Sequence, residues 1–399
     1  MQINNVKDRY DCIILGGGCS GLQLSNQIIW QLQTCRDAKY KKIRILILEG
    51  RNNYKNDKTW CFWDDGSSPY CRWASNRWES WSISTPQNNE IFKHKSKKYY
   101  YHRLSSETFY HNSIGRINNS PNVFLNLSNT VEVINRVNNE FEIKAGARTY
   151  YGKKLVDCRH VNPDKVENAV WQIFYGYEIK TKASLKNLES VNLMHEIRAD
   201  NSGIYFQYML PISVHSVLFQ TTYIGVDLFK PDRLKEETIL TIDRLFKNWV
   251  VLRTEQGTLL QSGIFDKETV EGVCYGGSSR GAIRPSNGYA FSRITKWSVN
   301  TAKLILETET VEIKKSLTSS IVGFMDEVFL QLLRRSPSDA VRTILCLAKY
   351  LSPETFARFM SDKLNFLDIM RVVFASPKIP MIISSWDKFK KNHANKIND

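Results

Sequence analysis

A carboxylate followed by a cluster of aromatic side chains stands near the start of the chain, where residues 57–63 read DKTWCFW. The face of an aromatic ring attracts a cation by roughly 0.5 to 2 kcal/mol, so Trp60, Phe62 and Trp63 could line an apolar substrate tunnel or stabilise a carbocation. Asp57 could supply or orient a proton beside them. The alternative for such aromatic residues is a hydrophobic core. We therefore treat Asp57 as a candidate catalytic residue and the three aromatic residues as candidate substrate contacts.

A glycine-rich turn before this cluster has the spacing of a dinucleotide-binding site. The apolar run at residues 12–15 predicts a short buried strand that leads into this turn and then into a helical pattern. Gly16 permits the tight turn, Gly18 lets the backbone approach a pyrophosphate, and Gly21 lets helix and strand pack closely. The next apolar run ends at Glu49, whose carboxylate can accept hydrogen bonds from ribose hydroxyls. The alternative is a glycine-rich loop without a ligand, but the flanking strand, helix and carboxylate favour a dinucleotide.

With residues 56–63 (NDKTWCFW) added, the chain resembles the FAD-dependent lycopene cyclases of the bacterial carotenoid type, which carry the run N-D-R-T-W-C-F-W there. The likeness continues in order over nearly the whole chain. It includes residues 101–110, 156–159, 193–194, 206–211, 277–291, 326–330 and 358–362, and the pair Pro377 and Pro380.

The resemblance implies an α/β fold: a Rossmann-like FAD-binding flavoprotein fold with an antiparallel β substrate domain and C-terminal helices. It also implies a non-covalent FAD, used in its reduced form without net redox change, and proton-initiated ring closure in lycopene or another acyclic polyene. Arg103 is expected near the FAD, although an exposed arginine is the ordinary alternative. A second glycine turn with Gly277 and Gly281 is expected to meet the FAD, and Tyr208 to contact the substrate.

Three positions depart from the acidic pattern of the family. The family has L-M-D-F-R where this chain has Leu193 and Met194 followed by His195, and its strand glutamate aligns with Gln220. The glutamate of its E-x-G-x-I-P-M segment aligns with Gln261. Glutamine keeps hydrogen-bonding capacity but cannot transfer a proton, whereas His195 could act as an acid or a base. Strand alternation is expected to place Glu196 on the face opposite His195.

These departures predict weak conversion of lycopene and leave three functions open. The first is a cyclase with a relocated acid. The second is a FAD-dependent oxidoreductase or monooxygenase acting on another lipophilic substrate. For this second function NAD(P)H could serve as the electron source, although no NAD(P)H motif is visible. The third is a flavin-binding protein of little activity.

Composition narrows the partners and the compartment. The chain has 399 residues, 42% of them hydrophobic, and a net charge of +15. No nucleic-acid motif accompanies the dispersed basic residues, so we expect no nucleic acid and prefer a membrane surface as partner. Helices expected at residues 321–333 and 366–374 could rest on lipid, although such apolar stripes usually face a core. Because no long apolar run or signal-peptide pattern is present, we expect a cytoplasmic protein, peripheral at the inner membrane.

The cysteines and histidines indicate no metal site, since the eight cysteines form no C-x-x-C pair.

The elements that position the candidate residues divide the chain into three parts. Residues 1–65, 100–160 and 265–310 are assigned to the FAD-binding domain, and residues 66–99 and 161–264 to the substrate sheet. Residues 311–399 form the C-terminal helical region. Within the substrate part, residues 230–254 have a helical apolar pattern.

Overall fold

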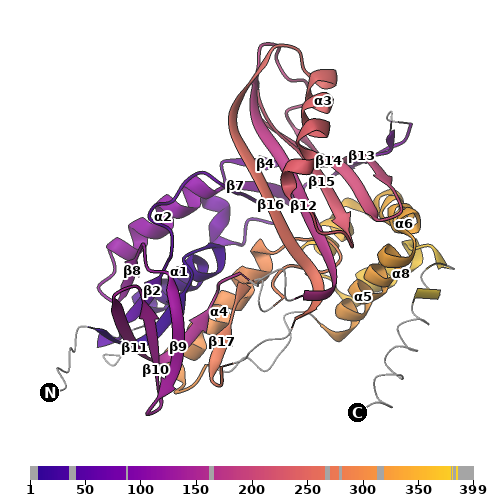
Figure 1. Ribbon diagram of the computed structural model, residues 1–399. Helices are drawn as coiled ribbons and strands as arrows, with labels where there is room; N and C mark the ends of the chain where they lie inside the picture. The colour runs from indigo at the N-terminus through magenta and orange to yellow at the C-terminus, as the bar shows by residue number, and fades with distance from the viewer. Residues whose placement is uncertain are drawn as a thin grey trace.

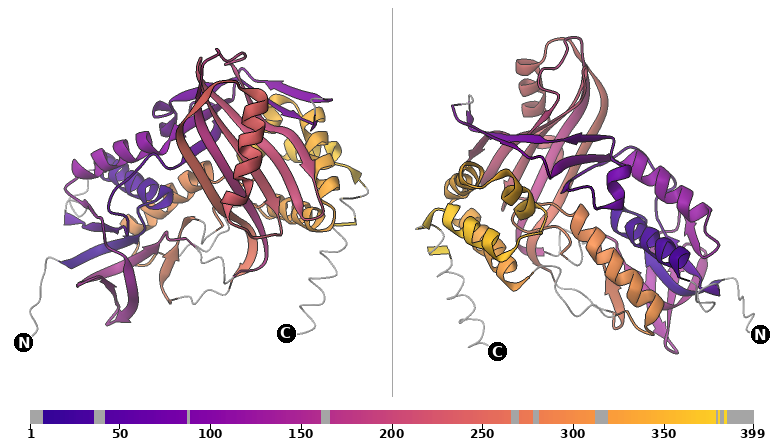
Figure 2. Two further views of the ribbon diagram at one scale, coloured as in Figure 1. Left: turned by 45° about the horizontal axis from the view of Figure 1, so that its top comes forward. Right: turned by 180° about the vertical axis from the view of Figure 1, so that it is seen from behind.

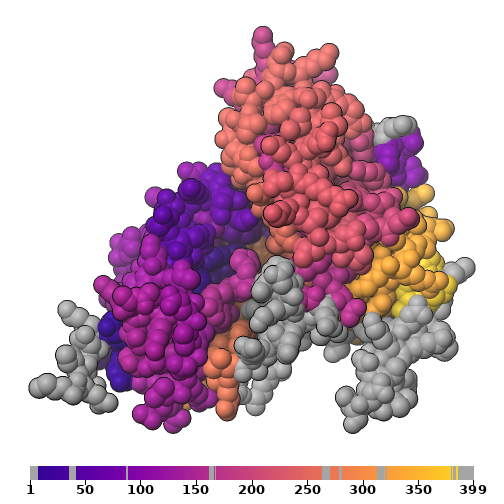
Figure 3. Space-filling model, viewed as in Figure 1, coloured from indigo at the N-terminus to yellow at the C-terminus, as the bar shows by residue number. Residues whose placement is uncertain are grey.

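The computed structural model describes residues 8–35, 42–86, 89–160, 166–265, 270–277, 281–311, 319–378, 380 and 383–384. Figure 1 shows three parts: the α/β unit that carries the first glycine turn, which we call the nucleotide-binding unit after its predicted role, a tall antiparallel sheet and a group of C-terminal helices. In the space-filling view the nucleotide-binding unit and the tall sheet form separate lobes (Figure 3). This architecture confirms the expected α/β class with an antiparallel sheet and C-terminal helices.

The nucleotide-binding unit is built on a sheet with the order β8-β2-β1-β11-β10-β9, in which β17 also pairs with β11. Its strands are β1 (Arg9–Leu15), β2 (Ile45–Leu48), β8 (Val123–Asn126), β9 (Val131–Val137), β10 (Glu140–Ala145), β11 (Arg148–Asp157) and β17 (Val273–Tyr275). Its helices are α1 (Cys19–Thr34), α2 (Ser106–Asn118) and α4 (Phe291–Glu307). Ile14 packs with the helices, whereas Ile13 and Leu15 pack with side chains of β10 and β11. Both faces of β1 are therefore covered, which explains its continuous apolar run.

A three-stranded antiparallel sheet carries the aromatic cluster. Its order is β3-β7-β4, with β3 (Thr59–Asp64), β7 (Tyr100–Ser105) and β4 (Asn76–Trp78), and the short helix η3 (Pro69–Arg72) follows β3. Successive side chains of a strand point to opposite faces. Phe62 therefore joins the core of the nucleotide-binding unit, and Trp63 joins the core beneath the tall sheet.

The tall sheet has the order β16-β12-β15-β14-β13-β5-β6. Its strands are β5 (Ser80–Ser84), β6 (Ile91–Lys95), β12 (Val166–Thr181), β13 (Ser190–Ala199), β14 (Gly203–Ser213), β15 (Ser216–Gly225) and β16 (Trp249–Phe265). The helices η6 (Pro231–Leu234) and α3 (Lys235–Leu245) cover one face (Figure 2). The helix expected over residues 230–254 is thus wrong over its last nine residues, because α3 ends at Leu245 and β16 begins four residues later.

The C-terminal helices pack on the other face of the tall sheet. They are α5 (Ser320–Arg335), α6 (Pro337–Tyr350), α7 (Pro353–Met360) and α8 (Phe366–Ala375). Ser319, Ser336, Ser352 and Asn365 cap their N-termini, as serine and asparagine side chains commonly do. Among the helices that the structure describes, none is long and apolar enough to cross a membrane.

Candidate functional site

The glycine turn at the start of α1 has the shape of a phosphate cradle. Gly16 has a φ of +90°, and a Cβ at Gly21 would lie 2.0 Å from the carbonyl oxygen of Gly16. A Cβ at Gly18 would meet no described atom within 4 Å. Gly18 is also the N-cap of α1, and no described side chain caps it or places an acid in the first turn. The open helix N-terminus therefore fits the pyrophosphate of a dinucleotide.

Glu49 lies at the end of β2, directly beside this turn. Its Oε2 accepts a hydrogen bond of 2.6 Å from the backbone N–H of Gly17, and its Oε1 accepts one of 2.9 Å from that of Arg51. Burial alone would raise the pKa of Glu49, but the hydrogen bonds and charge of Arg51 outweigh burial and lower it. Glu49 is therefore an ionised acceptor at the place where a ribose would lie, and the ribose contact itself stays a prediction.

The second glycine turn lies against the first. Gly277 has a φ of +65°, and a Cβ there would lie 2.7 Å from Oγ of Ser20 on α1. Gly281 has a φ of +71° and has no described atom within 4 Å of where its Cβ would be. Side chains other than glycine rarely adopt such angles. The structure thus brings the two turns together, while Arg280 lies outside the described residues.

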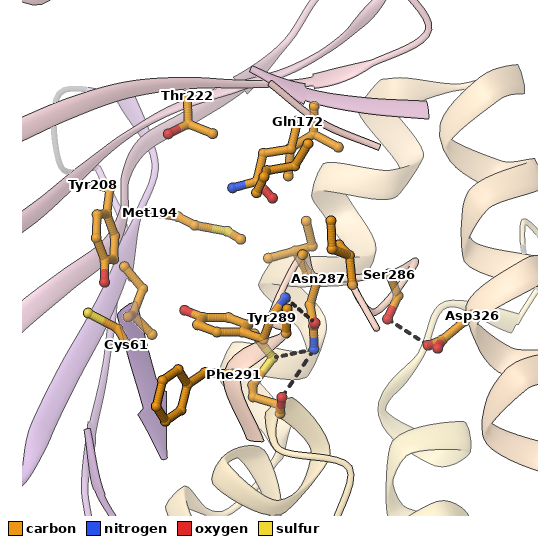
Figure 4. A pocket seen from close by; sticks show the side chains of 18 of the residues that line it. Cys61, Gln172, Met194, Tyr208, Thr222, Ser286, Asn287, Tyr289, Phe291 and Asp326 are labelled. Atoms are coloured by element: carbon orange, nitrogen blue, oxygen red, sulfur yellow. Dashed lines mark hydrogen bonds between the residues drawn. The ribbon is translucent and has the colours of Figure 1, made fainter. Parts of the chain in front are cut away.

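A cavity of about 730 Å³ runs from the glycine turn to the C-terminal helices. Gly18 and Ser20 line it at the nucleotide end, and Phe329 and Phe356 line it between the helices. Figure 4 shows Gln172, Met194, Tyr208 and Thr222 on the sheet side, opposite the loop that carries Asn287 and Tyr289. Its other lining residues from the tall sheet are mostly apolar: Phe174, Leu193, Ile204, Phe206, Ile224 and Leu259. The cavity thus joins a nucleotide-binding turn to a long apolar space.

One row of the sheet brings the polar groups of this cavity together. Tyr208 pairs with Gln220, Gln220 pairs with Gly176, and Gly176 pairs with Glu255. A Cβ at Gly176 would lie 2.3 Å from Cγ of Gln220, so only glycine leaves room for that side chain. Because neighbouring strands are about 4.8 Å apart, Gln220 and Glu255 lie roughly 10 Å apart across the gap at Gly176.

Glu255 is the carboxylate that the sequence analysis missed. Its side chain is buried and lines the cavity. One carboxylate oxygen accepts a hydrogen bond from Thr59 N at 2.8 Å, and the other accepts from Thr59 Oγ1 at 2.8 Å and from Arg253 at 3.0 Å. Gln261, by contrast, donates its amide to Gln172 and is not among the described residues that line the cavity.

The family spacing E-x-G fits Glu255 and Gly257 directly. The structure therefore favours Glu255, six residues before Gln261, as the position of that family glutamate. The signal was present in the sequence, but the expected helix over residues 230–254 ended just before it and hid the strand that carries it.

Arg103 is part of an ion network that reaches Glu255. Its guanidinium donates to Glu178 at 3.1 Å, and Arg253 donates to the same carboxylate at 2.8 Å. Arg253 also pairs with Glu255, so two arginines and two glutamates alternate in a chain whose two ends, Arg103 and Glu255, are buried. Arg103 is not among the described residues that line the cavity, and its contact with FAD stays a prediction.

A bulge in β13 moves His195 away from the cavity. The register of β13 shifts on both sides of His195, and Glu196 has a φ of +52°. Nδ1 of His195 lies 3.1 Å from Oγ of Ser84, and Nε2 lies 3.9 Å from the carboxylate of Glu196. Glu196 itself pairs with Arg244 of α3 at 2.6 Å. Neither residue is among the described lining of the cavity, so the geometry gives no support to a catalytic His195.

The bulge also corrects the expected strand alternation. His195 and Glu196 do not lie on strictly opposite faces, because the bulge adds one residue to β13. The run Glu196-Ile197-Arg198 then matches the D-F-R of the family pattern, with His195 as the extra residue. Of the three departures expected from the sequence, only the one at Gln220 then remains.

Among the aromatic candidates, only Trp60 and Tyr208 line the cavity. Phe62 stacks on Phe291 with a centroid distance of 4.7 Å, and Trp63 is 1% exposed. Both side chains help to build cores, so the geometry gives no support to the prediction that Phe62 and Trp63 contact the substrate. Asp57 accepts a hydrogen bond of 3.4 Å from Tyr110 and is also absent from the described lining.

Tyr208 belongs to a group of three tyrosines in the cavity wall. The hydroxyl of Tyr101 lies 2.6 Å from that of Tyr208 and 2.9 Å from that of Tyr289. Burial raises the pKa of all three above the ordinary value for tyrosine. The three hydroxyls therefore keep their protons and form a neutral hydrogen-bonded group beside the substrate space.

The thiols near the cavity are also neutral. Burial raises the pKa of Cys19 and of Cys61 to about 12, and that of Cys158 well above its ordinary value. A protonated thiol is a poor nucleophile and metal ligand. Among the described residues there is no group of three His, Cys, Asp or Glu side chains that could hold a metal ion.

Solved structures with the same fold are found among enzymes of several kinds. A geranylgeranyl bacteriochlorophyll reductase-like protein from Thermoplasma acidophilum matches with a TM-score of 0.57 and 10% identity, over 94% of this chain and 98% of that one. The Diels-Alderase PyrE3 of pyrroindomycin biosynthesis matches with a TM-score of 0.54 and 12% identity, over 93% and 81%. A variant of the halogenase PltM in complex with FAD matches with a TM-score of 0.53 and 11% identity, over 88% and 87%. Likeness at this level establishes the fold alone.

Sequence comparison identifies the family. A search of curated protein sequences finds no match to the chain. The family model described as Lycopene cyclase protein matches residues 11–385, which is nearly the whole length. The matched span includes both glycine turns, the row from Tyr208 to Glu255 and the four C-terminal helices that close the cavity. The chain therefore belongs to the lycopene cyclase family.

Proposed function

We propose that the protein holds FAD without a covalent bond and closes a ring at the end of lycopene or a related acyclic polyene. The observation that carries this proposal is the single cavity that begins at the glycine turn and continues as an apolar space between sheet and helices. A long hydrocarbon would fill the apolar part, and its end would lie beside the flavin.

The residues of the two glycine turns suit FAD. The open N-terminus of α1 at Gly18 would take the pyrophosphate, and Glu49 would accept the ribose hydroxyls. The neutral thiols of Cys19 and Cys158 favour a flavin that is not covalently attached. When bound and reduced, the flavin supplies an electron-rich ring that stabilises a neighbouring positive charge.

Ring closure needs a proton to be added to one carbon of the polyene and another to be removed. In this proposal the proton that starts the reaction is drawn from solvent and the proton that leaves is returned to solvent, so there is no net gain of protons. Glu255 accepts hydrogen bonds at both carboxylate oxygens and lines the cavity. It is therefore placed to stabilise the carbocation and to accept the proton that leaves it. Arg253 pairs with this carboxylate directly, and Glu178 links Arg103 to Arg253.

Trp60 and the tyrosine group assist from the cavity wall. The face of Trp60 can attract a cation in the same cavity. Tyr208 and Tyr289 stay protonated, so they add no negative charge that would trap a carbocation. The amide of Gln220 can form hydrogen bonds with polar neighbours, but it cannot transfer a proton.

The test is expression in a lycopene-accumulating bacterial host, followed by pigment separation and mass spectrometry. Ring closure is an isomerisation, so the expected product has the mass of lycopene and a shifted absorption spectrum. A matched control is the variant Gly18→Val, which should fold but lose FAD and leave lycopene unchanged. A product that has gained oxygen or changed its hydrogen content would instead establish the oxidoreductase alternative.

A further inference from the structure

We infer that α8 and the start of α5 form a docking surface for an anionic phospholipid bilayer at the mouth of the cavity. This inference rests on the proposed function, since a polyene dissolves in lipid and not in water. The α8 face, defined as the five exposed apolar side chains of that helix, consists of Phe366, Leu367, Met370, Val373 and Phe374.

The orientation of α8 is the reverse of that in an ordinary surface helix. Phe366 and Phe374 are each 70% exposed, whereas Asp368 and Val372 are buried. A helix of a soluble protein normally turns its apolar side to the core. Asp368 is tolerated inside because Arg358 pairs with it at 2.7 Å. The apolar side of α8 therefore faces away from the protein core.

The α8 face continues into the cavity. Val373 is 46% exposed and also lines the cavity, as does Phe324 of α5, which is 37% exposed. Ile321, one turn before Phe324, is 53% exposed. Figures 1 and 2 show α5 and α8 side by side at the end of the molecule away from the nucleotide-binding unit. An apolar molecule that enters here would pass from lipid into the cavity without crossing water.

Charge favours lipid over a second copy of the chain. Arg358 and Arg371 share the one carboxylate of α8, Asp368, so this group stays positive. Lys378 also lines the cavity mouth. A symmetric contact between two copies would bring the same cations together, whereas anionic headgroups complement them. An interfacial helix of this kind buries its apolar side about 5 to 10 Å into the boundary of the bilayer.

The test is flotation of the full-length, FAD-loaded protein with vesicles of phosphatidylcholine, with and without phosphatidylglycerol. The wild type is expected to float with the anionic vesicles. The variant Phe366→Ser/Phe374→Ser should bind them more weakly by roughly tenfold or more. The matched control is Leu240→Ser/Val250→Ser, which removes two side chains of similar exposure (62% and 59%) on α3 and β16, and it should float like the wild type.

The contrary outcomes are distinct. Equal flotation of the α8 variant and the control would overturn the docking surface. A wild-type dimer that the α8 variant converts to a monomer in light scattering would assign the face to a second copy and overturn lipid docking. FAD absorbance is read in every sample. A protein that keeps FAD but does not float contradicts docking alone, whereas a protein without FAD contradicts the proposed function.

Discussion

The glycine turn and the cavity face of the tall sheet reach the same cavity but are specified in different ways. At the turn, neighbouring residues decide the geometry, since a Cβ at Gly21 would collide with the carbonyl of Gly16 five residues away. On the sheet, four strands spread over residues 166–265 bring Tyr208, Gln220 and Glu255 into one row. A local motif therefore fixes the shape of the turn, whereas strand register decides which polar groups line the cavity.

The largest effect is expected where the local motif is most crowded. Gly21→Ala should lower the free energy of unfolding by roughly 3 kcal/mol or more, because the backbone oxygen 2.0 Å from the new Cβ cannot move freely. Denaturant unfolding measures this loss. A stable Gly21→Ala protein would contradict the close packing of α1 against the turn.

Gly18 separates the cofactor role of the turn from its structural role. The space around its Cβ position is open in the described structure, so Gly18→Val should leave the unfolding free energy within about 0.5 kcal/mol without FAD. Its FAD affinity should fall roughly tenfold or more, because the valine side chain would occupy the place of the pyrophosphate. Flavin titration measures this affinity. An unchanged FAD affinity in Gly18→Val would contradict the phosphate cradle.

On the sheet, the decisive change is Glu255→Gln. Loss of the carboxylate should reduce ring formation roughly 10²- to 10⁴-fold, while FAD content stays the same. The matched control is Gln261→Glu, which restores an acid at the position that the sequence alignment first suggested. Pigment analysis of both variants is the measurement. Unchanged ring formation in Glu255→Gln, or increased ring formation in Gln261→Glu, would contradict the argument that strand register makes Glu255 the functional position.

A smaller effect is expected at Gln220, where the family pattern has an acid. Gln220→Glu places a proton donor in the same row of the cavity as Glu255. It should increase ring formation by roughly tenfold, at the low end of general acid catalysis. If the rate falls instead, the cavity is adapted to an amide at this position.

The smallest effect concerns His195, which packs outside the cavity. Burial lowers its pKa below the ordinary value, more than the neighbouring Glu196 raises it. The folded protein therefore binds fewer protons than the unfolded chain as the pH falls below about 6.5, and stability is lost in that direction. In the wild type, stability to thermal unfolding should therefore be lower at pH 5.5 than at pH 7.5. His195→Asn should reduce this difference in stability. Its pH profile of ring formation should match the wild type, and a changed profile would restore a catalytic role.

The two regions also show what a sequence can predict. The turn at Gly16, Gly18 and Gly21 was predicted residue by residue, because steric limits act between near neighbours. The α/β class was implied by the family resemblance. The sheet was harder, because the bulge at Glu196 changes the alternation that a sequence pattern assumes.

Glu255 was missed for a related reason. The apolar spacing before it suggested a helix, but the structure forms α3 only to Leu245 and then β16. Tertiary pairing of β16 with β12 overrides the local pattern. The aromatic run shows the same limit, since composition alone could not separate Trp60, which lines the cavity, from Phe62 and Trp63, which build cores.

The most direct measurement uses purified protein with reduced FAD and lycopene-loaded vesicles in deuterium oxide, under anaerobic conditions. Proton-initiated ring closure should add one solvent deuterium for each ring formed, while the flavin absorbance shows that the FAD stays reduced. Glu255→Gln should suppress this label together with the product. A product that carries oxygen, a product without deuterium, or flavin oxidised in step with turnover would contradict the account.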